Sequence, residues 1–161
     1  MTAAASSTAS HIRDREPEAA FRSNFIVGYP GETEADHGAL LAFVADADLD
    51  WCGFFAYSRE DGTYGASLDG TVPDGLRDER LAELRERQDV ITARKRDELV
   101  GARVEVLVDT PGVGRSHREA PEIDGVILVP DQLPVASFSV VTISASLGVD
   151  LEARAGLAQP A

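Results

Sequence analysis

The 161-residue chain has only one cysteine, Cys52. A single cysteine excludes an internal disulfide. It also excludes a cysteine-cluster metal site, because a structural zinc or an iron–sulfur cluster needs several ligands close together. Cys52 stands in the apolar segment DWCGFF, which favours a buried thiol in the core over a reactive one. The cysteine usage therefore predicts no metal held by this chain.

Long apolar runs are also absent from the sequence. A membrane-spanning helix requires about 18 such residues, and a signal peptide requires a basic and then an apolar region at the N-terminus. The chain shows neither pattern. We therefore expect a cytoplasmic protein with no membrane contact.

Positive charge is scarce: 15 Lys and Arg stand against 28 Asp and Glu, for a net charge of −13. Most of the excess lies in residues 11–91, with 8 basic against 18 acidic residues, whereas residues 92–161 carry 7 against 10. An acidic surface repels phosphate backbones and attracts basic proteins over a Debye length of about 8–10 Å. The charge predicts a basic protein partner and argues against nucleic acid.

The first part of the chain has an α/β pattern. The segment FRSNFIVG is a predicted strand whose apolar run, residues 25–27, suits burial on both faces. Residues 32–47 have apolar side chains at helical spacing, and Thr33 with Asp36 forms a near capping box. A second apolar strand follows at residues 51–57. Strand, helix and strand at this spacing predict a βαβ unit with parallel strands.

The second part has a period of two. After a mostly solvated connecting helix, the segments ARVEVLVD, GVILVP and FSVVTISAS are predicted strands between turn residues, which is typical of a small antiparallel sheet or barrel. We place the change near Gly101. The expected organisation is a disordered tail at 1–11, an α/β part at 12–73, the connecting helix at 74–99, an all-β part at 100–155 and a tail at 156–161.

The segment VGYPGET follows the first predicted strand and resembles a phosphate-binding loop. A Walker loop needs a lysine where this chain has Glu32, and a dinucleotide fingerprint needs three glycines where only Gly28 and Gly31 are present. The segment is thus predicted to be a tight turn at the carboxyl end of a parallel strand, the edge where α/β enzymes place ligands. Tyr57 and Ser58 end the second strand and are expected at the same rim.

Histidines offer no further site. His37 and His117 have no second histidine or cysteine at ligand spacing, and both are expected at the surface.

Four stretches together resemble one family: FIVGYPGETE (25–34), FFAYSREDGTYGA (54–66), LVGARVEVLVD (99–109) and GRSHREAPEIDGVILV (114–129). They resemble the carboxyl-terminal part of the RimO family of radical S-adenosylmethionine methylthiotransferases. The resemblance implies a fold of two parts. A fragment of a partial (β/α) barrel is followed by a TRAM domain, a small all-β, OB-like barrel that docks the substrate.

The resemblance also implies cofactors and a substrate. Members of the family use S-adenosylmethionine and two four-iron four-sulfur clusters to methylthiolate an aspartate of small-subunit ribosomal protein S-twelve. The cluster cysteines are absent from this chain, so it has no catalytic or metal-binding residues of its own and we expect it to be inactive alone. The resemblance places the cofactor against a set of rim residues: Gly28, Tyr29, Gly31, Glu32, Tyr57 and Ser58.

The segment APEIDG (120–125) resembles the RimO branch rather than the related MiaB enzymes, which modify transfer RNA. We expect a substrate-docking set in this region: Arg115, Arg118, Glu119, Glu122 and Asp124. A charged hairpin rim that keeps the sheet soluble explains the same residues equally well. Two other functions stay open, namely a non-enzymatic TRAM module that binds ribosomal protein or RNA, and a MiaB-like enzyme.

The resemblance further suggests that the chain is a fragment from a truncated or split reading frame. A barrel portion without its earlier strands would expose an open sheet edge and apolar surface. We therefore expect the isolated chain to aggregate or to stay partly unfolded.

Overall fold

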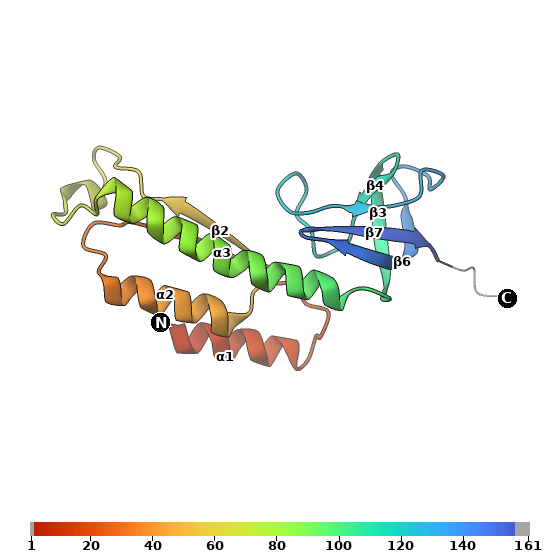
Figure 1. Cartoon of the computed structure of the whole chain (residues 1–161), viewed down its shortest axis with the longest axis horizontal. Coiled ribbons are helices and arrows are strands. Elements are labelled where there is room, and N and C mark those ends of the chain that lie inside the picture. Colours follow the sequence, from red (N-terminus) through yellow and green to blue (C-terminus); the bar gives the residue numbers. More distant parts are fainter. Residues whose placement is uncertain (1, 157–161) are drawn as a thin grey trace. The chain divides into compact units, whose positions relative to one another are not determined.

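The structure is a computed structural model that describes residues 2–156, with side chains from residue 8 onward. The chain forms two compact units that divide between Ile91 and Thr92, within the long helix α3 (Asp74–Glu98) (Figure 1). Among the described residues, no helix combines the length and apolar character needed to cross a membrane. Each unit has its own core.

The first unit contains the predicted βαβ arrangement. Strands β1 (Arg22–Val27) and β2 (Trp51–Ala56) pair in parallel, in a register that runs from Arg22 beside Trp51 to Val27 beside Ala56. Helix α2 (Glu34–Ala47) connects them. The prediction of two parallel strands joined by a helix is confirmed.

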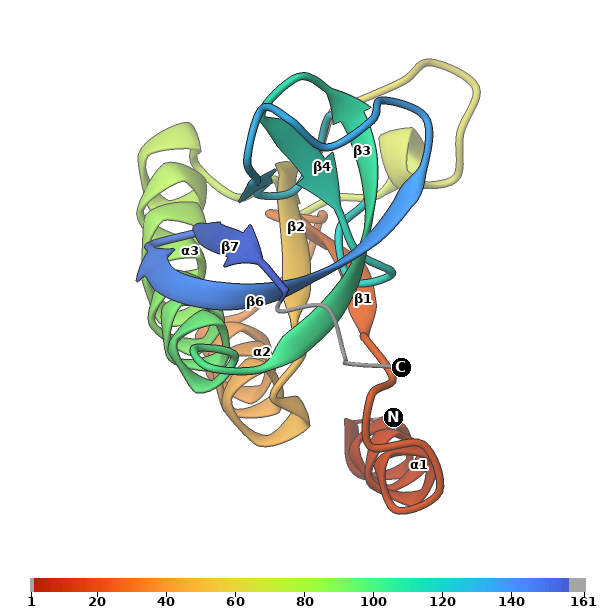
Figure 2. The same cartoon turned by 90° about the vertical axis from the view of Figure 1, so that its right-hand side faces the viewer.

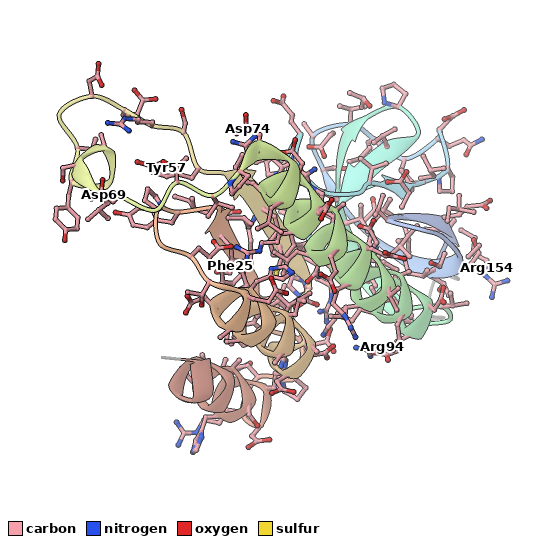
Figure 3. The ribbon with its side chains drawn as sticks, turned by 60° about the vertical axis from the view of Figure 1, so that its left-hand side comes forward. Phe25, Tyr57, Asp69, Asp74, Arg94 and Arg154 are labelled. Atoms are coloured by element: carbon pink, nitrogen blue, oxygen red, sulfur yellow. The ribbon has the colours of Figure 1, made fainter. Side chains whose placement is uncertain are left out.

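Helices α2 and α3 supply the apolar residues that cover one face of this two-stranded sheet. The buried core contains residues from both strands and both helices: Val27, Val44, Phe54, Leu81, Leu84 and Ile91. The Phe25 ring packs on this side, stacked on Phe54 with centroids 5.7 Å apart, and Figure 3 shows it beside the helices. α3 is therefore part of the core, in addition to its expected role as a connector.

The opposite face of the sheet is open. Ile26 is 61% exposed and Phe55 is 57% exposed, although both belong to apolar strands. The expectation that residues 25–27 are buried on both faces is thus wrong for Ile26. Side chains alternate along a strand, so Phe25 meets the helices while Ile26 points to a face that nothing covers among the described residues.

The expected disordered tail at residues 1–11 is a helix from its second residue. Helix α1 (Thr2–Arg13) lies against α2, as Figure 1 shows. Arg13 holds its end in place: the guanidinium donates to the carbonyl oxygens of Ala47 and Asp48 at 3.0 and 2.5 Å. The alanine-rich segment has high helix propensity, and the contact with α2 supplies a packing partner that the sequence pattern did not reveal.

Helix α2 begins with the predicted capping box. The Thr33 hydroxyl accepts a hydrogen bond from the Asp36 amide, and the Asp36 carboxylate accepts one from the Thr33 amide at 2.9 Å. The Thr33 side chain and then its backbone amide, both donating to the carboxylate, hold the pKa of Asp36 below its usual value. Two of the unpaired amides of the first turn are satisfied in this way.

The second unit is a closed barrel. Strands β3 (Arg103–Thr110), β4 (Val113–Arg115), β5 (Ile127–Leu128), β6 (Phe138–Leu147) and β7 (Asp150–Ala155) follow each other in the order β3-β4-β5-β7-β6. The long, curved β6 and its antiparallel neighbour β3 are visible in Figure 2.

The barrel confirms one of the two arrangements that the period of two predicted. β5 and β7 pair in parallel, which the sequence did not predict, and all other strand pairs are antiparallel. Alternate residues of the strands fill the interior: Val106, Val108, Ile127, Val129, Val141, Ile143, Leu151 and Ala153. Of the expected tail at 156–161, residues 157–161 lie outside the described residues.

Candidate functional site

The predicted turn at the end of β1 is built on two glycines with left-handed backbone. Gly28 has φ +82° and Gly31 has φ +86°, a region that residues with a Cβ rarely adopt. The Glu32 amide donates to the Tyr29 carbonyl oxygen at 2.9 Å, which closes the turn. One carboxylate oxygen of Glu32 accepts a hydrogen bond from the Gly28 amide at 2.8 Å. Glu32 therefore satisfies the backbone of its own turn, where a phosphate loop would place a cation.

A buried arginine of α3 binds this turn from behind. Arg80 Nη1 donates to the other carboxylate oxygen of Glu32 at 2.8 Å, and Nη2 donates to Glu34 at 3.1 Å. Only 4% of the Arg80 side chain is exposed. Arg80 was not among the residues predicted for this site. The available signal was its place directly before Leu81 and one turn before Leu84, on the apolar stripe of an otherwise charged helix.

Two tyrosines meet at the front of the turn. The rings of Tyr29 and Tyr57 pack edge to face with centroids 5.1 Å apart. The Tyr57 amide donates to the Val27 carbonyl oxygen at 2.8 Å, which extends the pairing of β1 and β2 by one residue. Gly65 lies against both rings: a Cβ at this position would be 2.6 Å from the Tyr57 hydroxyl oxygen. A larger residue there would require the Tyr57 ring to move.

An open pocket of about 680 Å³ lies in front of the tyrosine pair. Figure 3 shows Tyr57 where the chain leaves β2 for the loop that carries Asp69. The lining comes from both strands and from this loop: Asn24, Ile26, Tyr29, Phe55, Ala56, Tyr57, Ser58, Glu60, Thr63, Tyr64 and Gly65. The Tyr57 hydroxyl is buried and has no hydrogen-bond partner among the described residues. Aromatic and apolar walls suit the flat face of a planar ligand.

The predicted rim residues occupy one end of the sheet, but in two roles. Tyr29, Tyr57 and Ser58 line the pocket. Gly28, Gly31 and Glu32 are not part of the lining and form the turn behind it. Ser58 is exposed and donates to Glu60 at 3.3 Å.

The predicted docking residues all belong to the barrel unit. Arg115 forms an ion pair of 2.6 Å with Asp109, and Arg118 is half-buried. The Asp124 carboxylate accepts a hydrogen bond from the Ala120 amide at 2.8 Å, which closes the 120–124 turn. Glu122 is exposed in this turn and has a left-handed φ of +63°.

Glu119 does not face solvent, so its expected role in contacting a partner is wrong. Its side chain is 1% exposed and forms an ion pair with Arg96, from the last turn of α3. The second carboxylate oxygen accepts hydrogen bonds from the Ser116 amide and hydroxyl, each at 2.7 Å. A buried carboxylate needs such partners, and no local sequence pattern indicates that Arg96 supplies one.

The remaining candidates are structural. His37 is buried, contrary to expectation, and its Nε2 lies 2.8 Å from a carboxylate oxygen of Glu83 of α3. His117 is exposed, as expected. Burial raises the pKa of Cys52 to about 12, so the thiol stays protonated and unreactive. Among the described residues, no group of three or more His, Cys, Asp and Glu side chains could hold a metal ion.

Comparisons with known proteins identify the barrel. Residues 100–155 match the TRAM domain family. These residues contain all five barrel strands, so the barrel is a TRAM domain.

The chain is also similar to proteins named ribosomal protein uS12 methylthiotransferase RimO. It is 46% identical to the one from Moorella thermoacetica over 132 residues, and this aligned region is 82% of this chain and 30% of that protein. Identity to the one from Cutibacterium acnes is 40% over 148 residues, or 89% and 31% of the two chains. The one from Thermus thermophilus is 48% identical over 122 residues, or 73% and 28%.

The chain thus spans about 30% of the length of the curated relatives that it matches. The match covers most of this chain, including both units. The chain belongs to the RimO family of methylthiotransferases and corresponds to their carboxyl-terminal part, with a TRAM domain.

Proposed function

We propose that this chain supplies two parts of a radical S-adenosylmethionine methylthiotransferase that acts on an aspartate of ribosomal protein S-twelve. The first unit is a fragment of the partial (β/α) barrel and carries one wall of the cofactor site. The second unit docks the substrate. The observation that carries the proposal is the aromatic pocket at the carboxyl ends of two parallel strands, in a chain similar to RimO proteins.

The pocket fits the nucleoside end of S-adenosylmethionine. Tyr29 and Tyr57 offer aromatic surface to a planar base. When bound, S-adenosylmethionine supplies the reactive group. The chain's own residues bind and orient it, and the exposed Ile26 and Phe55 keep water from one side.

The residues of this chain do not fit the iron–sulfur clusters. A four-iron cluster is held by several cysteine thiolates, and the sequence has only Cys52. Burial keeps that thiol protonated, with a pKa of about 12. In this proposal the cluster ligands therefore come from another part of the enzyme.

For the docking surface we propose Arg115, Arg118, Glu122 and Asp124, with the buried Glu119 fixing the loop behind them. The 120–124 turn has two carboxylates beside the exposed Ile123. Ribosomal proteins are basic, and charge complementarity raises the rate of association and favours the right partner. The proposal places the enzyme in the cytoplasm, where ribosomes are modified.

The test is a titration of the chain with purified S-twelve protein at low and high salt, beside a titration with transfer RNA. We expect binding to the protein, and about tenfold weaker binding by Glu122→Lys. The control Glu105→Lys makes the same charge change on β3 and should bind as the wild type does. RNA affinity that falls steeply with salt, without affinity for the protein, would refute the proposal.

A second candidate function is a TRAM module that binds protein or RNA without catalysis. The closed barrel with its own core favours this alternative, because such a unit can fold without a complete enzyme around it. Binding of S-twelve by residues 92–161 alone, with no binding of S-adenosylmethionine by the full chain, would favour it. A MiaB-like function on transfer RNA is less favoured by the net charge of −13.

A further inference from the structure

Arg80 is a buried charge in the first unit. Its guanidinium lies between α3 and the turn after β1, bound to Glu32 and Glu34. Removing a charge from water costs several kcal/mol, and replacing a buried ion pair by apolar residues is often neutral or stabilising. A buried pair is therefore better explained by the geometry that it imposes than by the stability that it adds.

The geometry that Arg80 imposes is that of the Glu32 carboxylate. One oxygen of this carboxylate accepts from Arg80 at 2.8 Å and the other accepts from the Gly28 amide at 2.8 Å. Arg80 Nη1 also approaches the Glu32 carbonyl oxygen at 3.4 Å. Arg80 thus contacts both the carboxylate and the carbonyl oxygen of Glu32, the last residue of the turn. Because the same carboxylate also accepts from the Gly28 amide, Arg80 is linked to the first residue of the turn as well.

Two further contacts hold the turn on other sides. The side-chain stem of Arg77 covers Gly28 so closely that a Cβ there would be 2.6 Å from its Cγ. The Gly31 amide donates to the Gly70 carbonyl oxygen at 2.8 Å, which ties the turn to the loop after β2. Tyr29, between these fixed points, is the turn residue that lines the pocket.

We propose that Arg80 is a positioning residue that acts through Glu32 to hold the Tyr29 ring against Tyr57, and so shapes the pocket for the planar end of its ligand. This inference rests on the proposed function, in which that ligand is S-adenosylmethionine. Arg80 itself does not line the pocket. Its effect on binding passes entirely through the turn.

The first test measures amide hydrogen exchange in the full chain by NMR. In Arg80→Met we expect the Gly28 amide to exchange at least tenfold faster, because its acceptor loses its orientation, while amides at the buried Val44 keep their rates. Arg80→Lys should have a smaller effect, since a lysine can keep one ion pair but not the two-point contact. The control Arg87→Met removes the same charge from an exposed position of α3 and should leave Gly28 unchanged.

The second test measures S-adenosylmethionine binding by calorimetry. We expect a loss of about tenfold or more in Arg80→Met, a smaller loss in Arg80→Lys, and no loss in Arg87→Met. If Arg80→Met does not fold, Glu32→Gln replaces it, because this change keeps an oxygen acceptor for Gly28 and removes the charge that binds Arg80.

The outcomes separate the two proposals. Faster exchange at Gly28 together with weaker binding supports the positioning role. Unchanged exchange at Gly28, equally faster exchange at all amides, or faster exchange with unchanged affinity would overturn it. If the wild-type chain binds no S-adenosylmethionine, the proposed cofactor wall is refuted, whereas the exchange data still decide whether Arg80 fixes the turn.

Discussion

The two units of this chain solve the problem of strand edges differently. In the barrel, the order β3-β4-β5-β7-β6 closes on itself, and every strand has two neighbours. In the first unit, β1 and β2 pair only with each other among residues 2–156. One face of this sheet is covered by helices, while Ile26 and Phe55 are exposed on the other. Closure removes unpaired backbone, so the barrel has no strand edge without a neighbour, whereas β1 and β2 each have one such edge among the described residues.

Both units nevertheless use α3 in the same way. Arg80 binds Glu32 in the first unit, and Arg96 binds Glu119 in the second. Each arginine is buried and fixes a loop whose neighbouring residues we propose as functional. The two pairs differ in setting, because Glu119 is 1% exposed and Glu32 is 13% exposed. We therefore expect the free energy of unfolding of the barrel to depend more strongly on its buried ion pair than that of the first unit does.

The largest expected effect comes from breaking the barrel's ion pair. Glu119→Ala removes the buried carboxylate that pairs with Arg96, a change that typically costs about 3–5 kcal/mol. Urea unfolding followed by circular dichroism measures the loss. Glu122→Ala removes the same charge from an exposed position and should cost less than about 0.5 kcal/mol. Equal losses in the two variants would show that the buried pair adds nothing.

Core truncations test whether the units unfold separately. Ile143→Ala in the barrel and Leu84→Ala in the first unit remove buried side chains and should each cost about 2–5 kcal/mol. Trp51, the single tryptophan, reports on the first unit. We expect only Leu84→Ala to shift the transition seen by tryptophan fluorescence. A shift of that transition by Ile143→Ala would mean that the units unfold as one.

Loss of the capping box of α2 should lower the free energy of unfolding by an intermediate amount, and only in the first unit. Thr33→Ala removes the acceptor for the Asp36 amide and should lower the free energy of unfolding by about 1 kcal/mol. Because Thr33 also keeps the pKa of Asp36 low in the folded state, the part of its contribution that passes through the Asp36 carboxylate is present at neutral pH and lost as the pH falls through that pKa. The difference between the thermal melts of wild type and variant should therefore become smaller in acid, while the part due to the amide acceptor remains.

We expect the uncovered face of the two-stranded sheet to affect self-association more than the free energy of unfolding. Replacing Ile26 and Phe55 by threonine removes exposed apolar surface, so we expect less aggregation in sedimentation velocity and a change in unfolding free energy near zero. Phe138→Thr on the barrel is the control, since Phe138 is 69% exposed and so at least as accessible as Ile26 and Phe55. If Phe138→Thr reduces aggregation as much, the open sheet is not its main source.

The smallest effect concerns Cys52. Its pKa of about 12 in the folded state stands above the ordinary 9.0, so the folded chain keeps a proton that the unfolded chain releases. This contribution to stability is full below pH 9 and is lost as the pH rises toward 12. Alkylation by iodoacetamide at pH 8 should be slow in the native protein and fast in urea. Rapid alkylation without urea would show that the thiol is accessible.

Much of the fold could be predicted because it follows from local patterns. The period of two in residues 103–108 predicted β3, and Thr33 with Asp36 predicted the start of α2. The place of Gly28, Tyr29 and Tyr57 at one end of the sheet could be predicted, because a glycine turn after a buried strand is a local signal. Arg80, by contrast, contacts Glu32 across 48 positions of the chain, and no local pattern records such a pair.

The sequence by itself determined the order of elements, the α/β and all-β character of the two parts and the lack of cluster ligands, since each depends on residue type and near neighbours. Only the tertiary structure decided which polar residues are buried. It placed His37, Arg80, Arg96 and Glu119 inside and left Ile26 outside. Burial depends on which distant segment packs against a residue. In this chain α3 is the segment that packs against the turn after β1.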